Sequence, residues 1–157
     1  MIYSDITEFK TFLKDGYRLM GLDIGKVRIG CALSDPRKIL SFPHSMFNLK
    51  KQKFTLTQVK DILEKEQVYG IVVGNPLQMD GETGSACEMV DKFIKKYLLP
   101  LNQPIYMQDE RLSSSAVNRY FQEMELTRKQ QAAINDKAAA SYILQIALDK
   151  LQHIQEI

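Results

Sequence analysis

Three acidic residues stand where a folded chain could bring them together. Asp23 follows the apolar run YRLMGL, Glu110 comes just after PIYMQ, and Asp136 precedes KAAASYILQIAL. Each has an ordinary structural interpretation: a turn-capping aspartate, a loop ion pair worth about 0–1 kcal/mol, and a helix N-cap formed by Asn135 or Asp136. None of the three alone predicts a function.

Together the three carboxylates predict a metal centre. Two carboxylates roughly 4 Å apart repel by about 4 kcal/mol at an effective dielectric constant of about 20, so ionised groups this close need cations. Oxygen ligands suit Mg²⁺ or Mn²⁺, and two such ions recur in sites where water attacks a phosphodiester. A histidine or zinc mechanism is poorly supplied, because the chain has only His44 and His153 and its two cysteines lack CxxC spacing.

The elements that must position these residues predict an α/β fold. Residues 17–24 and 27–34 are apolar runs joined by a turn that contains Gly25, which indicates a β-hairpin. Residues 39–47 add a third strand, which Pro43 restricts to an edge or a bulge. The remaining pattern predicts helix 54–67, strand 70–74, helix 85–98, strand 104–108, helix 113–124 and helix 136–153. A mixed sheet with helices on its faces follows.

Length and composition favour one small globular domain. The chain has 157 residues, 45% of them hydrophobic, and a formal charge of only +2, which by itself points to neither a nucleic acid nor a membrane. We expect an N-terminal extension over residues 1–16 and a single domain over 17–157. Ile6, Phe9, Phe12 and Leu13 suggest a short amphipathic helix in the extension, covering a sheet edge or a partner. The absence of a leader or a long apolar run predicts a cytoplasmic protein with reduced cysteines and no membrane association.

The segments GLDIGKVRIGCALSD, VVGNPLQMDGETG, DERLSS and NDKAAASYILQ occur in an order and spacing that resembles the YqgF family of bacterial RNase H-like nucleases. This family is described both as Holliday-junction resolvases and as nucleases that mature the 5′ end of 16S ribosomal RNA. The resemblance covers about residues 18–151. It implies an RNase H-like fold: a five-stranded mixed sheet of order 3-2-1-4-5, with an antiparallel hairpin start and helices on both faces.

The resemblance also implies roles for individual residues. Asp23, Glu110 and Asp136 would be the catalytic carboxylates and would bind two Mg²⁺ or Mn²⁺ ions. The chain departs from the family pattern at Lys26-Val27-Arg28, where Thr-Lys-Arg is common, and at Gly74-Asn75-Pro76-Leu77-Gln78, where Gly-Leu-Pro-Leu-Asn is usual. The segment before the last helix is also less basic than in the family. Neither local change removes a carboxylate.

Basic residues near the proposed site are candidates for phosphate binding, since arginine offers a bidentate fork and lysine a point charge. The expected nucleic-acid contacts are Lys26, Arg28, Arg111, Arg128, Lys129 and Lys137; balancing the charge of the acids explains those beside the carboxylates equally well. Gly25, Asn75, Asp80 and Gly81 are expected to support the surrounding loops, although Asp-Gly is also a common turn former. The lysine runs at 50–53 and 95–96 could be outer nucleic-acid contacts, but such runs are usually solvated surface, which is the preferred interpretation. Tyr106 and Phe121 are expected to belong to the core.

The sequence thus predicts a divalent-metal-dependent nuclease of the two-metal-ion type, acting on structured nucleic acid. Processing of the 5′ end of pre-16S rRNA is preferred over resolution of a four-way DNA junction. A non-catalytic RNA-binding protein of ribosome assembly is a second alternative. An actin-like ATPase or sugar kinase needs two related domains, which 157 residues do not supply. The oligomeric state is left as monomer or homodimer; a symmetric junction would favour a dimer.

Overall fold

A computed structural model of the chain describes residues 1–51, 53–75, 85–109 and 128–154, and for residues 85–86 and 128–137 it describes the backbone alone. The predicted helix 113–124 lies outside the described residues. Among those that are described, no helix has the length and apolar character needed to cross a membrane.

The centre of the fold is a six-stranded mixed sheet in the order β1-β6-β5-β2-β3-β4. β2 pairs antiparallel with β3 and parallel with β5, so the predicted hairpin start and the order 3-2-1-4-5 are both confirmed. β1 adds a sixth strand beside β6 that the sequence analysis did not predict. The strands are β1 Ile2–Tyr3, β2 Arg18–Ile24, β3 Arg28–Ser34, β4 Ser41–Asn48, β5 Val68–Asn75 and β6 Ile105–Asp109.

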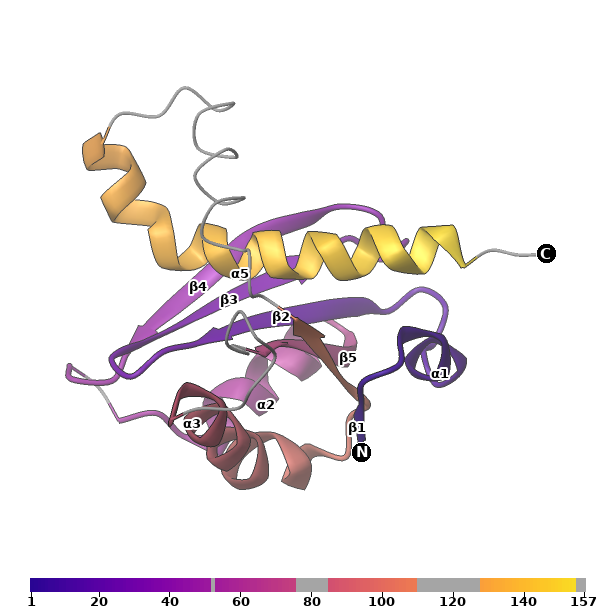
Figure 1. Ribbon diagram of the computed structural model, residues 1–157, viewed down its shortest axis with the longest axis horizontal. Coiled ribbons are helices and arrows are strands. Elements are labelled where there is room, and N and C mark those ends of the chain that lie inside the picture. The colour runs from indigo at the N-terminus through magenta and orange to yellow at the C-terminus, as the bar shows by residue number, and fades with distance from the viewer. Residues whose placement is uncertain (52, 76–84, 110–127, 155–157) are drawn as a thin grey trace.

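Helices cover both faces of the sheet, as predicted (Figure 1). On one face lie α2, Leu56–Lys65, and α3, Ser85–Phe93, which continues as a π-helical turn, Ile94–Leu98, and a 3₁₀ turn, Leu99–Leu101. On the other face α5, Arg128–His153, packs across β2, β3 and β4, and α1, Ile6–Thr11, contacts α5 and β6. Each face therefore has its own hydrophobic core.

Helix α5 begins eight residues earlier than the sequence analysis predicted. Its first residue is Arg128, so Asn135 and Asp136 lie inside the helix and neither is its N-cap. The segment RKQQAA explains the extra turns, because alanine, glutamine, lysine and arginine are all strong helix formers. The interpretation of Asn135 or Asp136 as the N-cap of this helix is therefore wrong.

The edge strand β4 carries the irregularity predicted from Pro43. Cys31 pairs with Ser45, whereas the next residue, Ala32, pairs with Pro43, so His44 is an extra residue at a bulge. Proline cannot donate a hydrogen bond to a neighbouring strand, and both an edge and a bulge tolerate this loss. This part of the prediction is confirmed.

The N-terminal extension is part of the folded body. α1 buries the Phe9 side chain completely, against Tyr106 with ring centroids 5.6 Å apart, and Ile6 and Leu13 pack at the border of the same core. Burial of one such aromatic side chain stabilises a fold by roughly 2–3 kcal/mol. Phe12 follows the helix, is 46% exposed and stacks on Tyr3. The extension thus covers the sheet edge at β6, which was one of its two predicted roles.

Neither cysteine forms a disulfide bond, which agrees with the expectation of reduced thiols. Cys31 lies in the core on β3, and burial raises the pKa of its thiol to about 12, with a smaller opposing effect from the Ser45 hydrogen bond. A thiol with so high a pKa stays protonated near neutral pH and is a poor nucleophile. Cys31 therefore has a packing role.

Candidate active site

Three strands end at one edge of the sheet. β2, β5 and β6 are mutually parallel, so their last residues, Ile24, Asn75 and Asp109, lie at the same end. From β2 the chain continues to one side through β3 and β4, and it later returns to the other side through β5 and β6. The carboxyl ends of strands beside such a reversal of direction are where open α/β sheets bind ligands.

Asp23 lies on this edge, in β2, and faces α5. Side chains alternate along a strand, and Leu19 and Gly21 both face α5, so Asp23 shares their face. It is half-buried and pairs with Gly30 of β3. Asp23 is thus a strand residue at the C-terminal edge, and it precedes the turn at Gly25.

Glycines occupy the strand positions on both sides of Asp23. Gly30 is its partner on β3, and Gly74 follows Val73, the β5 partner of Leu22. Beyond Gly74 comes Gln108 of β6, a buried side chain whose Oε1 accepts a hydrogen bond from Lys150 Nζ of α5 at 3.2 Å. Because glycine has no side chain, neither neighbouring strand position places a side chain beside Asp23 on the α5 face. A carboxylate at such a position can serve as an oxygen ligand for a metal ion.

Helix α5 brings the predicted Asp136 position toward Asp23. A Cβ atom on Gly21 would lie 2.7 Å from Leu144 Cβ and 3.1 Å from the Ala140 carbonyl oxygen, so α5 crosses β2 there. Near the C-terminus of α5, Gln152 donates a hydrogen bond to the Lys38 carbonyl, which lies before β4. Earlier in α5, the Ser141 carbonyl accepts a hydrogen bond from Ser41, the first residue of β4. Toward its N-terminus α5 therefore runs in the direction of the Asp23 end. Position 136 is one turn before Ala140 on this path.

Several predicted site residues lie outside what the structure describes. These are Asp80, Gly81, Glu110 and Arg111, together with the side chains of Arg128, Lys129, Asp136 and Lys137. Within the described residues, no group of three histidine, cysteine or acidic side chains forms a metal site. The three-carboxylate centre therefore stays a prediction, of which the structure describes Asp23.

The turn after Asp23 is tight and ends in basic residues. The Gly25 N–H donates to the Arg28 carbonyl at 2.9 Å, and a Cβ on Gly25 would lie only 2.9 Å from that oxygen. Glycine is therefore required there. Lys26 and Arg28 are both exposed, and alternation along β3 places Arg28 on the same face as Asp23.

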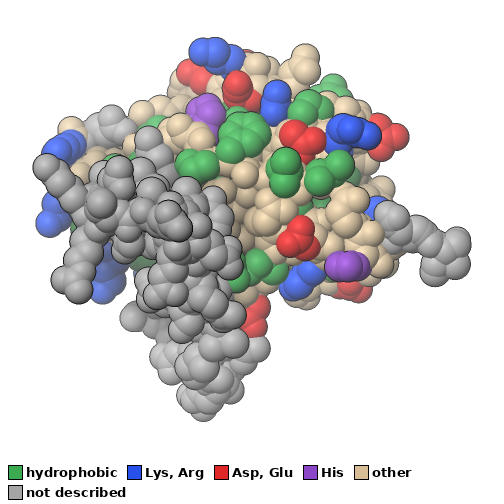
Figure 2. All heavy atoms as spheres, turned by 90° about the horizontal axis from the view of Figure 1, so that it is seen from above, with side chains coloured by type: hydrophobic (Ala, Val, Ile, Leu, Met, Phe, Trp, Pro, Cys, Tyr) green, Lys and Arg blue, Asp and Glu red, His purple; other side chains and the backbone are tan. Residues whose placement is uncertain are grey.

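A second group of lysines joins this turn. The Leu49 N–H donates to the Val27 carbonyl at 2.7 Å, which holds the segment after β4 against the turn. Figure 2 shows Lys and Arg side chains at the left end of the α5 face, with the visible acidic side chains elsewhere. The exposed basic residues brought to this end, here called the basic end, are Lys26, Arg28, Lys50, Lys51 and Lys53. For the last three, the sequence analysis preferred ordinary surface over an outer nucleic-acid contact, because only the β3–β4 pairing brings them beside Asp23's hairpin.

Asn75 and Asp109 mark the other side of the edge. They pair at the ends of β5 and β6, and Asn75 Oδ1 accepts a hydrogen bond from the Cys87 thiol of α3 at 3.6 Å. Alternation places Asp109 on the face of Met107, opposite Asp23. The edge thus has two sides: Asp23 faces α5, and Asn75 reaches α3.

The sequence matches the family described as "RuvX: Holliday junction resolvase" over residues 17–150. It is 32% identical, over 154 residues, to a "Putative pre-16S rRNA nuclease" of Rickettsia akari, covering 98% of this chain and 100% of the relative. A Rhodospirillum rubrum protein of the same name is 39% identical over 146 residues, covering 91% and 89%.

The fold is similar to that of T. thermophilus RuvC, solved in complex with a Holliday junction substrate. The TM-score is 0.53 at 11% identity, and the match covers 86% of this chain and 96% of that one. At so low an identity the likeness concerns the fold alone. It confirms the predicted RNase H-like fold class.

Proposed function

The chain belongs to the RuvX family, and on this premise we propose that it is a divalent-metal-dependent nuclease that hydrolyses phosphodiester bonds in structured nucleic acid. The observation that carries the proposal is the placement of Asp23. It is a half-buried carboxylate on the middle strand, at the edge where three strands end, with glycine positions on both sides. A carboxylate in this place can act as a metal ligand at the end of the sheet where open α/β folds bind ligands.

In the proposed mechanism Asp23, Glu110 and Asp136 would hold two Mg²⁺ or Mn²⁺ ions. Bound there, the metal would supply Lewis acidity for the attack of water on phosphorus and for departure of the leaving oxygen. Gly30 and Gly74 place no side chain beside Asp23, where the scissile phosphate would lie. The basic end would hold the flanking phosphates, with Lys26 in the hairpin turn and Arg28 directly after it. Gln108 is the next side chain across the sheet from Gly74, on β6, and its Oε1 is held by Lys150.

The proposed substrate is the 5′ end of precursor 16S rRNA. Support comes from the names of the relatives from Rickettsia akari and Rhodospirillum rubrum, the first of which aligns along its whole length. Resolution of a four-way DNA junction is the second candidate, because the family description itself names a Holliday junction resolvase. Both substrates present phosphates to the same centre, so the two proposals share one mechanism and differ in the surfaces that bind the nucleic acid.

The test is cleavage by purified protein with Mg²⁺ or Mn²⁺, comparing a precursor-rRNA end with a four-way junction. We expect the Asp23→Asn variant to lose cleavage of both, because a neutral amide is a weaker metal ligand than a carboxylate. Asp35→Asn, at the opposite end of the hairpin, is the matched control and should cleave normally. Normal cleavage by Asp23→Asn would refute the mechanism, and RNA binding by the wild type without cleavage in either metal would favour a ribosome-assembly protein.

A further inference from the structure

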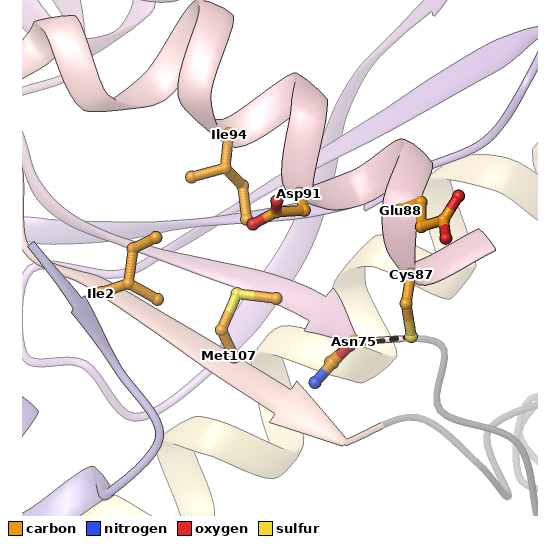
Figure 3. Close-up of a pocket in the computed structure, with 7 residues that line it drawn as sticks. All are labelled: Ile2, Asn75, Cys87, Glu88, Asp91, Ile94 and Met107. Carbon is orange, nitrogen blue, oxygen red and sulfur yellow. Dashed lines mark hydrogen bonds between the residues drawn. The ribbon is translucent and has the colours of Figure 1, made fainter. Parts of the chain in front are cut away.

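A pocket of about 350 Å³ lies on the α3 side of the same sheet edge. Figure 3 shows α3 above it and the β5 and β6 strands below. Three apolar side chains, Ile2, Ile94 and Met107, line it together with the polar Asn75, Glu88 and Asp91. This volume is at the lower end of the roughly 300–1,000 Å³ range of small-ligand sites. Asp23, the residue proposed for catalysis that the structure describes, does not line this pocket.

The lining combines apolar surface with a few polar groups that can be assigned as hydrogen-bond donors or acceptors. The Cys87 thiol holds Asn75 Oδ1, so the Nδ2 amide group lies on the other side of the side chain, as Figure 3 shows, and is a donor. Asp91 and Glu88 supply carboxylate acceptors from α3; Asp91 also pairs with Lys95 at 2.9 Å, which leaves further lone pairs of its carboxylate for other donors. The pocket therefore offers donors and acceptors around an apolar interior.

We infer that this pocket binds an unstacked nucleobase of the substrate, with guanine preferred. A base has flat apolar faces, which suit Ile2, Ile94 and Met107, and hydrogen-bonding groups on its edge. Guanine alone presents an acceptor, O6, next to the N1–H and N2–H₂ donors. Asn75 Nδ2 can donate to O6, and the Asp91 carboxylate can accept from the two nitrogens. The carboxylates repel phosphate, so only the base enters and the backbone stays at the sheet edge.

The position of the pocket ties it to the proposed reaction, and the inference rests on that proposed function. Asn75 and Asp23 are on adjacent strands and differ by one residue in register, so their Cα atoms are about 6 Å apart by standard strand spacings. A nucleic acid crossing the edge can therefore have a phosphate at Asp23 and a neighbouring base in the pocket. Such a base must be unpaired. This favours a single-stranded RNA end over a junction whose bases are all paired.

The experiment measures binding of short RNA by fluorescence anisotropy, without divalent metal so that no cleavage occurs. The probes are the ribo-oligonucleotides UUUUU, UUGUU and UUIUU, where inosine (I) lacks the N2 amine of guanine. We expect wild-type protein to bind UUGUU about tenfold more tightly than UUUUU, with UUIUU between them.

Two variants and one control give the inference its specificity. Ile2→Trp should fill the pocket and abolish the guanine preference, and Ile39→Trp is the matched control, because both isoleucines are about 40% exposed and lie at opposite edges of the sheet. Asp91→Asn should remove the distinction between guanine and inosine. Equal binding of UUGUU and UUUUU by the wild type, or an unchanged preference in Ile2→Trp, would overturn the inference. A different result would refute the proposed function alone: Asp23→Asn would cleave normally while the guanine preference persisted.

Discussion

Asp23 and Asp35 lie at the C-terminal ends of the two strands of one hairpin, Asp23 near the end of β2 and Asp35 directly after β3. They are therefore at opposite ends of the sheet, and their surroundings differ. The Asp35 carboxylate accepts backbone hydrogen bonds from Ile39 at 2.7 Å, Leu40 at 2.9 Å and Arg37 at 3.1 Å. Burial opposes its ionisation, but these backbone donors outweigh that effect and lower the pKa of Asp35. Asp23 has a glycine opposite it and lies beside the basic end.

The Asp35 end is held together by its own polar groups. Ser41 Oγ donates to the Ser141 carbonyl at 2.6 Å, and Gln145 bonds both the Ser41 N–H and the Ile39 carbonyl, which fixes α5 to β4. Buried and half-buried groups satisfied in this way stabilise a fold. The comparison teaches that an aspartate after a strand has no fixed role. What separates the two is the neighbouring strand positions: glycines beside Asp23, and a closed turn around Asp35.

The largest effect should come from placing a side chain beside Asp23. A Gly30→Val substitution puts a branched side chain opposite the carboxylate on the α5 face, and we expect cleavage per folded molecule to fall at least about 100-fold, because small misplacements of reacting groups cost that much. Circular dichroism and urea unfolding measure the folded fraction. A folded Gly30→Val protein with wild-type cleavage would show that catalysis does not need a glycine opposite Asp23.

Gly21 sharpens the comparison, because it is a glycine of the same strand that serves packing. An added Cβ would meet Leu144 Cβ at 2.7 Å and the Ala140 oxygen at 3.1 Å. We expect Gly21→Ala to lower the free energy of unfolding by about 1–3 kcal/mol, the usual cost of overpacking. Urea denaturation measures it. Leu144→Ala in the same chain should give a loss smaller than the sum of the two single losses, and strict additivity would contradict direct contact.

Much of this fold follows from the sequence, because its signals are local. The hairpin appears as two apolar runs around Gly25, and Pro43 predicts the irregular edge strand. β1 could not be predicted, since its two residues form a strand only by pairing with residues 105 and 106. The start of α5 was misplaced because Asn135 and Asp136 resemble a cap, although the preceding residues are good helix formers.

The candidate site was predictable in residue type and much less so in geometry. The sequence identifies Asp23 as a candidate, but only the strand register shows that Gly30 and Gly74 lie beside it. In the same way, Lys50 and Lys51 join the site only because the segment after β4 is hydrogen-bonded to the β2–β3 turn. The pocket beside α3 needs residues from β1, β5, β6 and α3, so no single stretch of sequence predicts it.

Asp35 should affect stability and leave cleavage alone. Asp35→Asn loses one accepting oxygen, so we expect a loss of about 1 kcal/mol at pH 7. Because the pKa of Asp35 is lower in the folded state, its contribution is present above the unfolded value of about 3.9 and is lost as the pH falls through the folded pKa. Urea unfolding from pH 7 to pH 2.5 should show the wild type and the variant converging. A gap that stays constant with pH would contradict an ionised Asp35.

The smallest effect should be a change in RNA binding when lysines or arginines are removed from the Asp23 end or from the Asp35 end of the sheet. Removing Lys50 and Lys51 together should weaken RNA binding several-fold and lower the slope of log affinity against log salt by about 1.4, since each phosphate contact on a single strand contributes roughly 0.7. The matched control removes two charges from the opposite end, Lys14→Ala with Arg37→Ala, where Lys14 lies over the Tyr69 ring at 4.2 Å. Both double variants change the net charge equally, so a general electrostatic effect would weaken binding in both. If only the Lys50 and Lys51 variant changes the salt slope, the nucleic acid binds at the Asp23 end; equal slopes would place its path elsewhere.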